Sequence, residues 1–250
     1  MNNEEKRRLK QQDKFHELTG EGIQWAETHR STTIASIVAL VVIVGGIVGG
    51  YSLYQHRTAE AETAFGGAMQ TYQTPLVNAE QPAPPGMKTF ADAKSRAAAA
   101  NTQFVQVANQ FGLTKPGKLA EYFAGLTYEE EGQNGQAEDA LKKASSSWDG
   151  GIAALGKMAL AQLYQQTGRD QQAIDLYNEL AKGDATTVPP TEAQLQLAAL
   201  YESQGKTEEA RKIYAVLKDK DKNSKGKPGE AAQIASAKLN PQASAGAGPQ

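Results

Sequence analysis

Residues 160–177 read LAQLYQQTGRDQQAIDLY, and residues 197–214 read LAALYESQGKTEEARKIY. Both stretches place a glycine four residues after a tyrosine and an alanine five residues after that glycine. A third copy of this register begins at Tyr128, so that the three tyrosines are separated by 36 and 37 residues (128 to 164, then 164 to 201). A period of this length indicates a repeated supersecondary unit.

Each copy predicts a hairpin of two α-helices. The glycine lets the chain leave the first helix through a left-handed turn, and the later alanine places the second helix close against the first. One hairpin buries too little apolar surface to stand alone, so neighbouring hairpins must stack. The residue three positions before each tyrosine is small enough for two helices to cross closely; these residues are Gly125, Ala161 and Ala198.

The register resembles the tetratricopeptide repeat, a unit of 34 residues that forms two antiparallel helices. Each copy here is two or three residues longer, and Glu121, Lys157 and Gln194 stand where that family usually has a large aromatic residue early in the first helix. The resemblance implies an all-α fold, with a tetratricopeptide-like solenoid of helical hairpins over residues 58–240. The expected repeats cover about 118–150, 154–187 and 191–220.

The segments around the repeats are assigned by composition and spacing. Apolar residues at helical spacing predict a helix within 89–112, while 58–78 either continues a membrane helix outward or forms the partner of that helix. The expected remaining features are a proline-rich break at 81–86, a lysine-rich linker at 218–228, a capping helix at 230–239 and a disordered tail at 241–250.

A single membrane-spanning helix is expected at residues 31–54. No Asp, Glu, Lys or Arg occurs from position 31 to position 56, and Trp25 on one side and Tyr51 and Tyr54 on the other suit the two membrane interfaces. A cleaved signal peptide has a short basic start and a core of about 7–15 apolar residues. Here 30 residues precede a longer core, which favours an uncleaved anchor.

The distribution of basic residues predicts the orientation of this anchor. Residues 1–30 carry six Lys and Arg residues, whereas the 20 residues after the span carry only Arg57. Because basic loops stay in the cytoplasm, we expect a cytoplasmic tail at 1–30, a bacterial inner-membrane location and a periplasmic C-terminal domain.

Four glycines in the span give two overlapping small-xxx-small spacings. Gly45 and Gly49 form one and Gly46 and Gly50 the other, and such a face lets another membrane helix approach closely. The alternative explanation of this face is that glycine is common in transmembrane helices in general.

The composition argues against catalysis and cofactors. The chain has no cysteine, and its three histidines (16, 29 and 56) all precede residue 58, so the repeat domain lacks the ligands of Cys or His zinc sites and a histidine base. Gly205-Lys206-Thr207 resembles the end of a phosphate-binding loop, but Leu200 replaces the required earlier glycine. The run Glu129–Glu131 is interpreted as a solvated helix end. We predict no enzyme activity, no metal and no small-molecule substrate; the net charge of −2 predicts no nucleic-acid partner.

In tetratricopeptide domains the first helix of each hairpin lines the concave face. Applied to this chain, that arrangement predicts a groove suited to apolar or extended protein segments, with methionine supplying adaptability. Packing between helices is the alternative role for several of its members. The candidate groove residues are Tyr122, Leu126, Met158, Gln162, Gln165, Leu195, Ala199 and Glu202.

The order of parts narrows the resemblance. A charged tail, one membrane helix and a helical repeat domain are similar to the ancillary subunit of the bacterial Sec translocon. That resemblance implies a membrane-anchored interaction protein whose partners are the translocon, periplasmic chaperones or unfolded secretory chains. The alternative is a structural subunit of a larger membrane complex, docked through its transmembrane helix.

Overall fold

A computed structural model of the chain describes residues 29–77, 86, 88–220 and 229–240. Within these ranges the elements are α-helices, with an isolated parallel bridge between Leu76 and Phe90. The chain divides into two units, residues 1–56 and 57–250. The expected tail before residue 29, the proline-rich stretch up to 85, the linker from 221 to 228 and the C-terminal tail lie outside the described residues.

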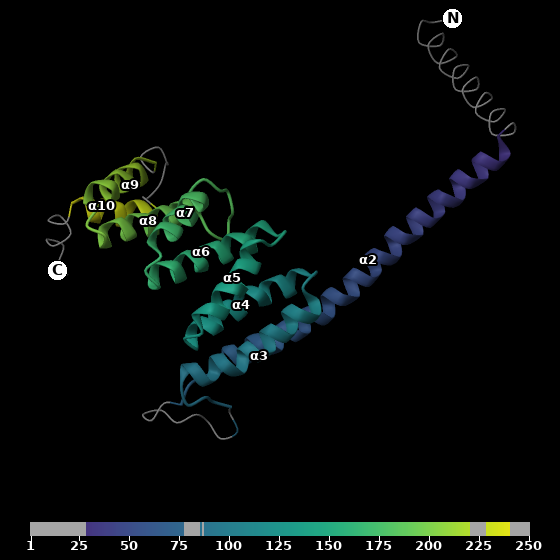
Figure 1. Cartoon of the computed structure of the whole chain (residues 1–250), viewed down its shortest axis with the longest axis horizontal. Coiled ribbons are helices and arrows are strands. Elements are labelled where there is room, and N and C mark those ends of the chain that lie inside the picture. The colour runs from purple at the N-terminus through teal and green to yellow at the C-terminus, as the bar shows by residue number, and fades with distance from the viewer. Residues whose placement is uncertain (1–28, 78–85, 87, 221–228, 241–250) are drawn as a thin grey trace, which may run out of the picture. The chain divides into compact units, whose positions relative to one another are not determined.

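Helix α2 (Arg30–Tyr72) contains the whole of the expected membrane span (Figure 1). Within the first unit its apolar side chains are exposed, from Ile34 at 61% to Leu53 at 64%. Among the described helices it alone is long and apolar enough to cross a membrane, with a mean hydropathy of 2.4 over its best 18 residues.

The last part of α2 belongs to the second unit and pairs with α3 (Ala93–Phe111). Ala61 and Ala68 are fully buried, and the Phe65 ring lies 5.7 Å from the rings of both Phe104 and Phe123. The apolar positions of this part are spaced three and four residues apart, which places them on one face of the helix. The segment 58–72 therefore both continues the apolar helix and forms the partner of α3.

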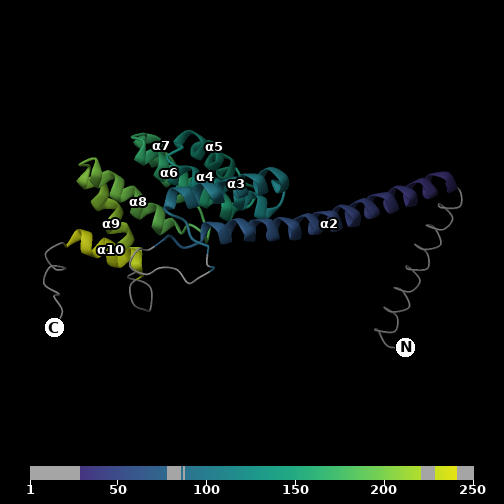
Figure 2. The same ribbon diagram turned by 90° about the horizontal axis from the view of Figure 1, so that it is seen from below.

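Three further hairpins follow, and each helix packs against the next along the chain (Figures 1 and 2). The all-α repeat fold expected from the sequence is confirmed. The helices of these hairpins are α4 (Lys115–Glu130) with α5 (Asn134–Ser145), α6 (Gly150–Gln166) with α7 (Asp170–Leu180), and α8 (Pro190–Ser203) with α9 (Thr207–Lys220).

The repeated tyrosine and glycine form the same turn in each hairpin. Gly132, Gly168 and Gly205 have φ angles of +80°, +73° and +73°. The amide after each glycine donates a hydrogen bond to the carbonyl of the register tyrosine; in the second hairpin the Arg169 N to Tyr164 O distance is 2.8 Å. This pattern is the Schellman motif, which satisfies carbonyl groups at the helix end.

The small residues before the tyrosines are where the paired helices cross. A Cβ atom placed on Gly125 would lie 2.6 Å from Leu141 Cδ2, which leaves no room for a side chain. Ala161 and Ala198 occupy the equivalent positions and are fully buried. The second-helix alanines are also fully buried, as expected; they are Ala137, Ala173 and Ala210.

Helix α10 (Glu230–Leu239) packs against α9 and α8. Its Ala235 is buried in a cluster with Ala198 and Leu217, and Lys238 Nζ lies 2.7 Å from Glu202 Oε2 on α8. A helix at 230–239 is therefore confirmed, and it covers the last hairpin. The lysine-rich segment begins differently from the expectation, because α9 continues to Lys220 instead of ending before Lys218.

Candidate protein-binding surface

The first helix of each repeat keeps one stripe of side chains outside the core. In α6, Leu160 and Leu163 are buried, whereas Met158 and Gln165 are half-buried and Gln162 is exposed. Positions 158, 162 and 165 follow the helical period, so they share one face. This face of α6 is the central part of the candidate surface.

The other two first helices present comparable stripes. On α4, Tyr122 and Leu126 are half-buried. On α8, Leu195 and Glu202 are half-buried and Ala199 is exposed. The fold therefore leaves all eight predicted residues at least partly accessible, with Gln162 and Ala199 the most open.

Three of the apolar residues come together. Tyr122, Leu126 and Met158 all pack against one buried cluster, which contains Leu160 and Tyr177. We call these three half-buried side chains, two on α4 and one on α6, the apolar strip. Leu195 lies elsewhere, because it packs on the cluster formed by α8, α9 and α10.

Two of the polar residues are already bound within the domain. The Tyr177 hydroxyl donates a hydrogen bond of 3.3 Å to Gln165 Oε1, joining the two helices of one hairpin. Glu202 accepts a hydrogen bond of 2.7 Å from Lys238 of α10. Burial first, and then the charge and hydrogen bond of Glu202, raise the pKa of Tyr214 to about 12. Gln165 and Glu202 therefore hold helices together, which sequence spacing did not reveal.

Leu195 also lines a pocket beside α10. The pocket has a volume of about 420 Å³ and includes Glu192, Leu217, Ala231 and Ile234. It lies between the last hairpin and the capping helix, so it is separate from the strip around Met158.

The glutamate run at the end of α4 contacts neighbouring helices. Gln166 Nε2 of α6 donates a 2.8 Å hydrogen bond to Glu129 Oε1. Glu130 accepts a hydrogen bond from the Tyr72 hydroxyl, and Glu131 accepts one from Gln133. The run ends α4 with Glu130 exposed, as expected for a solvated helix end, and its three carboxylates also accept hydrogen bonds from three different partners. The partners lie up to 58 residues away in the chain, where local charge patterning gives no information.

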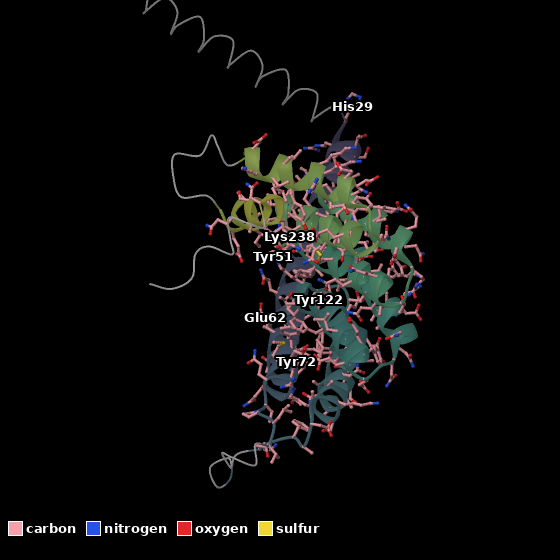
Figure 3. All side chains as sticks on the ribbon, turned by 90° about the vertical axis from the view of Figure 1, so that its left-hand side faces the viewer. His29, Tyr51, Glu62, Tyr72, Tyr122 and Lys238 are labelled. Carbon is pink, nitrogen blue, oxygen red and sulfur yellow. The ribbon has the colours of Figure 1, made fainter. Side chains whose placement is uncertain are left out.

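The Tyr72 contact belongs to an aromatic cluster that the sequence reading did not identify. Tyr72 and Tyr122 lie in the same part of the second unit (Figure 3), and both rings meet Phe123 edge-on, at 6.1 Å and 5.2 Å. Burial raises the pKa of Tyr72 to about 12, and Glu130 adds to that rise. Through Phe123, the cluster packs against Tyr122, which is one of the three residues of the apolar strip.

An ionic network ties the first repeat to the second. Arg169 Nη1 and Glu138 Oε2 are 2.7 Å apart, and Lys142 Nζ lies 2.7 Å from Glu138 Oε1. The Arg169 guanidinium also stacks on the Tyr164 ring at 4.3 Å. The hydrogen bond from Lys142, followed by that from Arg169, holds the pKa of Glu138 below its ordinary value. Glu138 therefore stays charged near neutral pH and links the first hairpin to the second through Arg169.

The four glycines of the predicted membrane contact lie on α2 in the first unit. Gly45, Gly46, Gly49 and Gly50 are exposed, and a Cβ atom added to any of them would meet nothing within 4 Å.

Two family models match the chain, and both describe a tetratricopeptide repeat. One covers residues 158–187, which includes all of α7, and the other covers residues 192–224, which includes all of α9. These hairpins are tetratricopeptide-like. No curated protein and no solved structure matches the chain.

The matches agree with the register found at Tyr164 and Tyr201, and together with the hairpins they define a helical repeat scaffold. Tetratricopeptide repeats form protein-interaction modules, so the second unit is assigned that general role. Among the described residues, no three His, Cys, Asp or Glu side chains gather to hold a metal ion.

Proposed function

We propose that this chain is a single-pass protein of the bacterial inner membrane whose tetratricopeptide-like domain binds other proteins in the periplasm. The observation that carries the proposal is the apolar part of α2. Its side chains are at least half exposed from Ile34 to Val48 wherever they are large and apolar, as at Val44 (50%) and Val42 (67%). An all-round apolar helix is stable when lipid or a large core surrounds it.

The strip formed by Tyr122, Leu126 and Met158 is the proposed binding surface, together with the exposed positions Gln162 on α6 and Ala199 on α8. Half-buried aromatic and aliphatic groups provide an apolar contact at low conformational cost, and the flexible methionine adapts to different side chains. The proposed ligand is an apolar or extended segment of an unfolded protein.

The resemblance to the ancillary Sec translocon subunit suggests where such segments come from. Under this proposal the chain assists protein secretion or envelope assembly, with the translocon, periplasmic chaperones or emerging secretory chains as its partners. The basic tail supports a cytoplasmic N-terminus. A reporter enzyme that works only in the periplasm should be active when fused after Gln250. Activity of a reporter that works only in the cytoplasm, fused at the same place, would contradict the orientation.

Matched charge substitutions test the binding surface. Gln162→Glu and Ala199→Glu place a carboxylate on first helices, whereas Gln172→Glu and Ala215→Glu place one on exposed positions of second helices. Binding of the detergent-solubilised chain to a labelled unfolded polypeptide should weaken about tenfold, ~1.4 kcal/mol, for the first pair only. Equal effects in both pairs would rule out this strip as the binding site.

The alternative is a structural subunit that docks through the glycine face of its membrane helix. The four-residue spacing of Gly45 and Gly49 on one face of the helix favours it. Photocrosslinkers at Gly45 or Gly49 and at Met158 distinguish the two. Protein adducts from position 158 support the interaction module, whereas adducts from the glycine positions alone support the docked subunit.

A further inference from the structure

Two large apolar side chains of the second unit stand in solvent at neighbouring corners. Leu113 is 87% exposed, in the corner between α3 and α4, and Trp148 is 61% exposed, in the corner between α5 and α6. Lys115 Nζ lies 2.9 Å from Asp149 Oδ2, and this ion pair joins the two corners. The two side chains therefore lie on the same edge of the repeat domain, in the loops that connect successive helical pairs.

Helix capping does not explain these residues. Thr114 and Asp149 are N-caps, so Leu113 and Trp148 occupy the position that often packs on the fourth helical residue as a hydrophobic staple. That fourth residue is Lys118 in α4 and Ala153 in α6. Neither provides an apolar partner of matching size, and both staple residues remain exposed.

The corners are held firmly, so the exposure of the two side chains is built into the fold. The Thr114 amide and hydroxyl each lie 2.8 Å from Phe111 O, and the Ile152 amide donates a 3.0 Å hydrogen bond to Asp149. A Cβ atom on Gly117 would lie 1.9 Å from Phe111 O, so only glycine fits this corner.

The first residue of the second unit, which follows the expected membrane span in the chain, lies on the same edge. Arg57 is the first residue of the unit, its Nη2 donates a 3.2 Å hydrogen bond to Gln110 O, and its guanidinium lies 5.3 Å from the Phe111 ring centre. The expected span ends at Tyr54. Three residues therefore carry the chain from the end of the expected span to the first residue of the second unit.

We propose that Leu113 and Trp148 insert into the headgroup region of the bilayer, giving the repeat domain a second contact with the membrane. The inference rests on the proposed membrane anchor. Tryptophan and leucine are favoured at this depth, because their apolar bodies leave water while the indole N–H keeps a polar partner.

Quenching of Trp148 fluorescence by brominated phospholipids tests the proposal. The chain has two tryptophans, so Trp25→Phe leaves Trp148 as the only one. This full-length variant is reconstituted into vesicles of phosphatidylcholine and phosphatidylglycerol, with and without bromine on the acyl chains. We expect strong quenching and a blue-shifted emission, both reduced by the added substitution Leu113→Asp.

The matched control moves the tryptophan to the opposite end of the hairpin. Asn134 begins α5 and is exposed, and this helix of 12 residues spans ~18 Å. In the variant Trp25→Phe, Trp148→Phe, Asn134→Trp we expect little quenching and emission typical of water.

Vesicle flotation separates the two levels of the proposal. If the chain floats with vesicles but Trp148 is quenched no more than the tryptophan at position 134, the second contact is wrong and the anchor stands. If the chain does not float, the anchor itself is wrong, and the second contact falls with it.

Discussion

Helix α2 contains two regions of similar backbone and opposite surroundings. In the first unit Val41 is 64% exposed and Val48 is 62% exposed, whereas Ala61 and Ala68 in the second unit are fully buried. The first region is apolar all round, and the second is apolar on one face only. The comparison shows that the pattern of apolar residues, more than their number, indicates whether protein or lipid will cover a helix.

Removing the first region should have the largest effect. Deletion of residues 31–54 should transfer the protein from the membrane pellet to the soluble fraction after alkaline carbonate extraction, because no other described helix could cross a bilayer. Deletion of residues 241–250 is the control and should leave the protein in the pellet. A shortened chain that still sediments with the membranes would show that another part of the molecule anchors it.

Gly156→Ala should destabilise the repeat domain, to which the second region belongs, strongly. A Cβ atom at this position would lie 2.5 Å from the Ser145 backbone nitrogen, so α6 and α5 must move apart. We expect a loss of about 3 kcal/mol in the free energy of unfolding, measured by urea titration. Gly135→Ala meets nothing within 4 Å and should instead gain about 0.5 kcal/mol. Similar losses for the two variants would contradict the close crossing.

Two truncations on α2 itself sharpen the comparison. Phe65→Ala removes a half-buried ring that contacts Phe104 and Phe123, and should lower the unfolding free energy of the repeat domain by about 2 kcal/mol. Leu53→Ala lies on the same helix but is 64% exposed and should leave that unfolding free energy unchanged. Urea titration followed by circular dichroism in micelles measures both. The two regions would be energetically equivalent if both variants destabilised the domain.

The ionic network predicts a smaller, pH-dependent effect. The pKa of Glu138 is lowered in the folded protein from an ordinary value of 4.5. Below that value the unfolded chain binds the proton more readily, so the stabilisation present above pH 4.5 is lost as pH falls through the lowered pKa. Glu138→Gln should cost about 1 kcal/mol at pH 7 and progressively less in acid. A difference between the two proteins that does not change with pH would exclude this role for the carboxylate.

The hairpins could be predicted because their determinants are local. The register tyrosine, glycine and alanine lie within ten residues of one another, and Gly168 is required by its own φ angle of +73°. The apolar run of α2 is equally local, since it depends on composition along one stretch. Both features can be found without knowing which distant segments meet.

The features that sequence reasoning missed depend on residues far apart in the chain. Tyr72 reaches Glu130, and Lys238 reaches Glu202 across 36 positions. The second of these contacts occupies a residue that spacing alone assigned to ligand binding. The role of residues 58–72 also stayed open, because the partner rings on α3 and α4 decide it.

Helix α10 covers the side of the last hairpin that another repeat would otherwise cover. A row of like hairpins has no intrinsic last member, since the outer side of each one matches the inner side of the next. Here a ten-residue helix fills that place, with Ala232 and Ala235 turned inward. Without it, the apolar side of α8 and α9 that α10 covers would be exposed to water, which favours self-association of the protein.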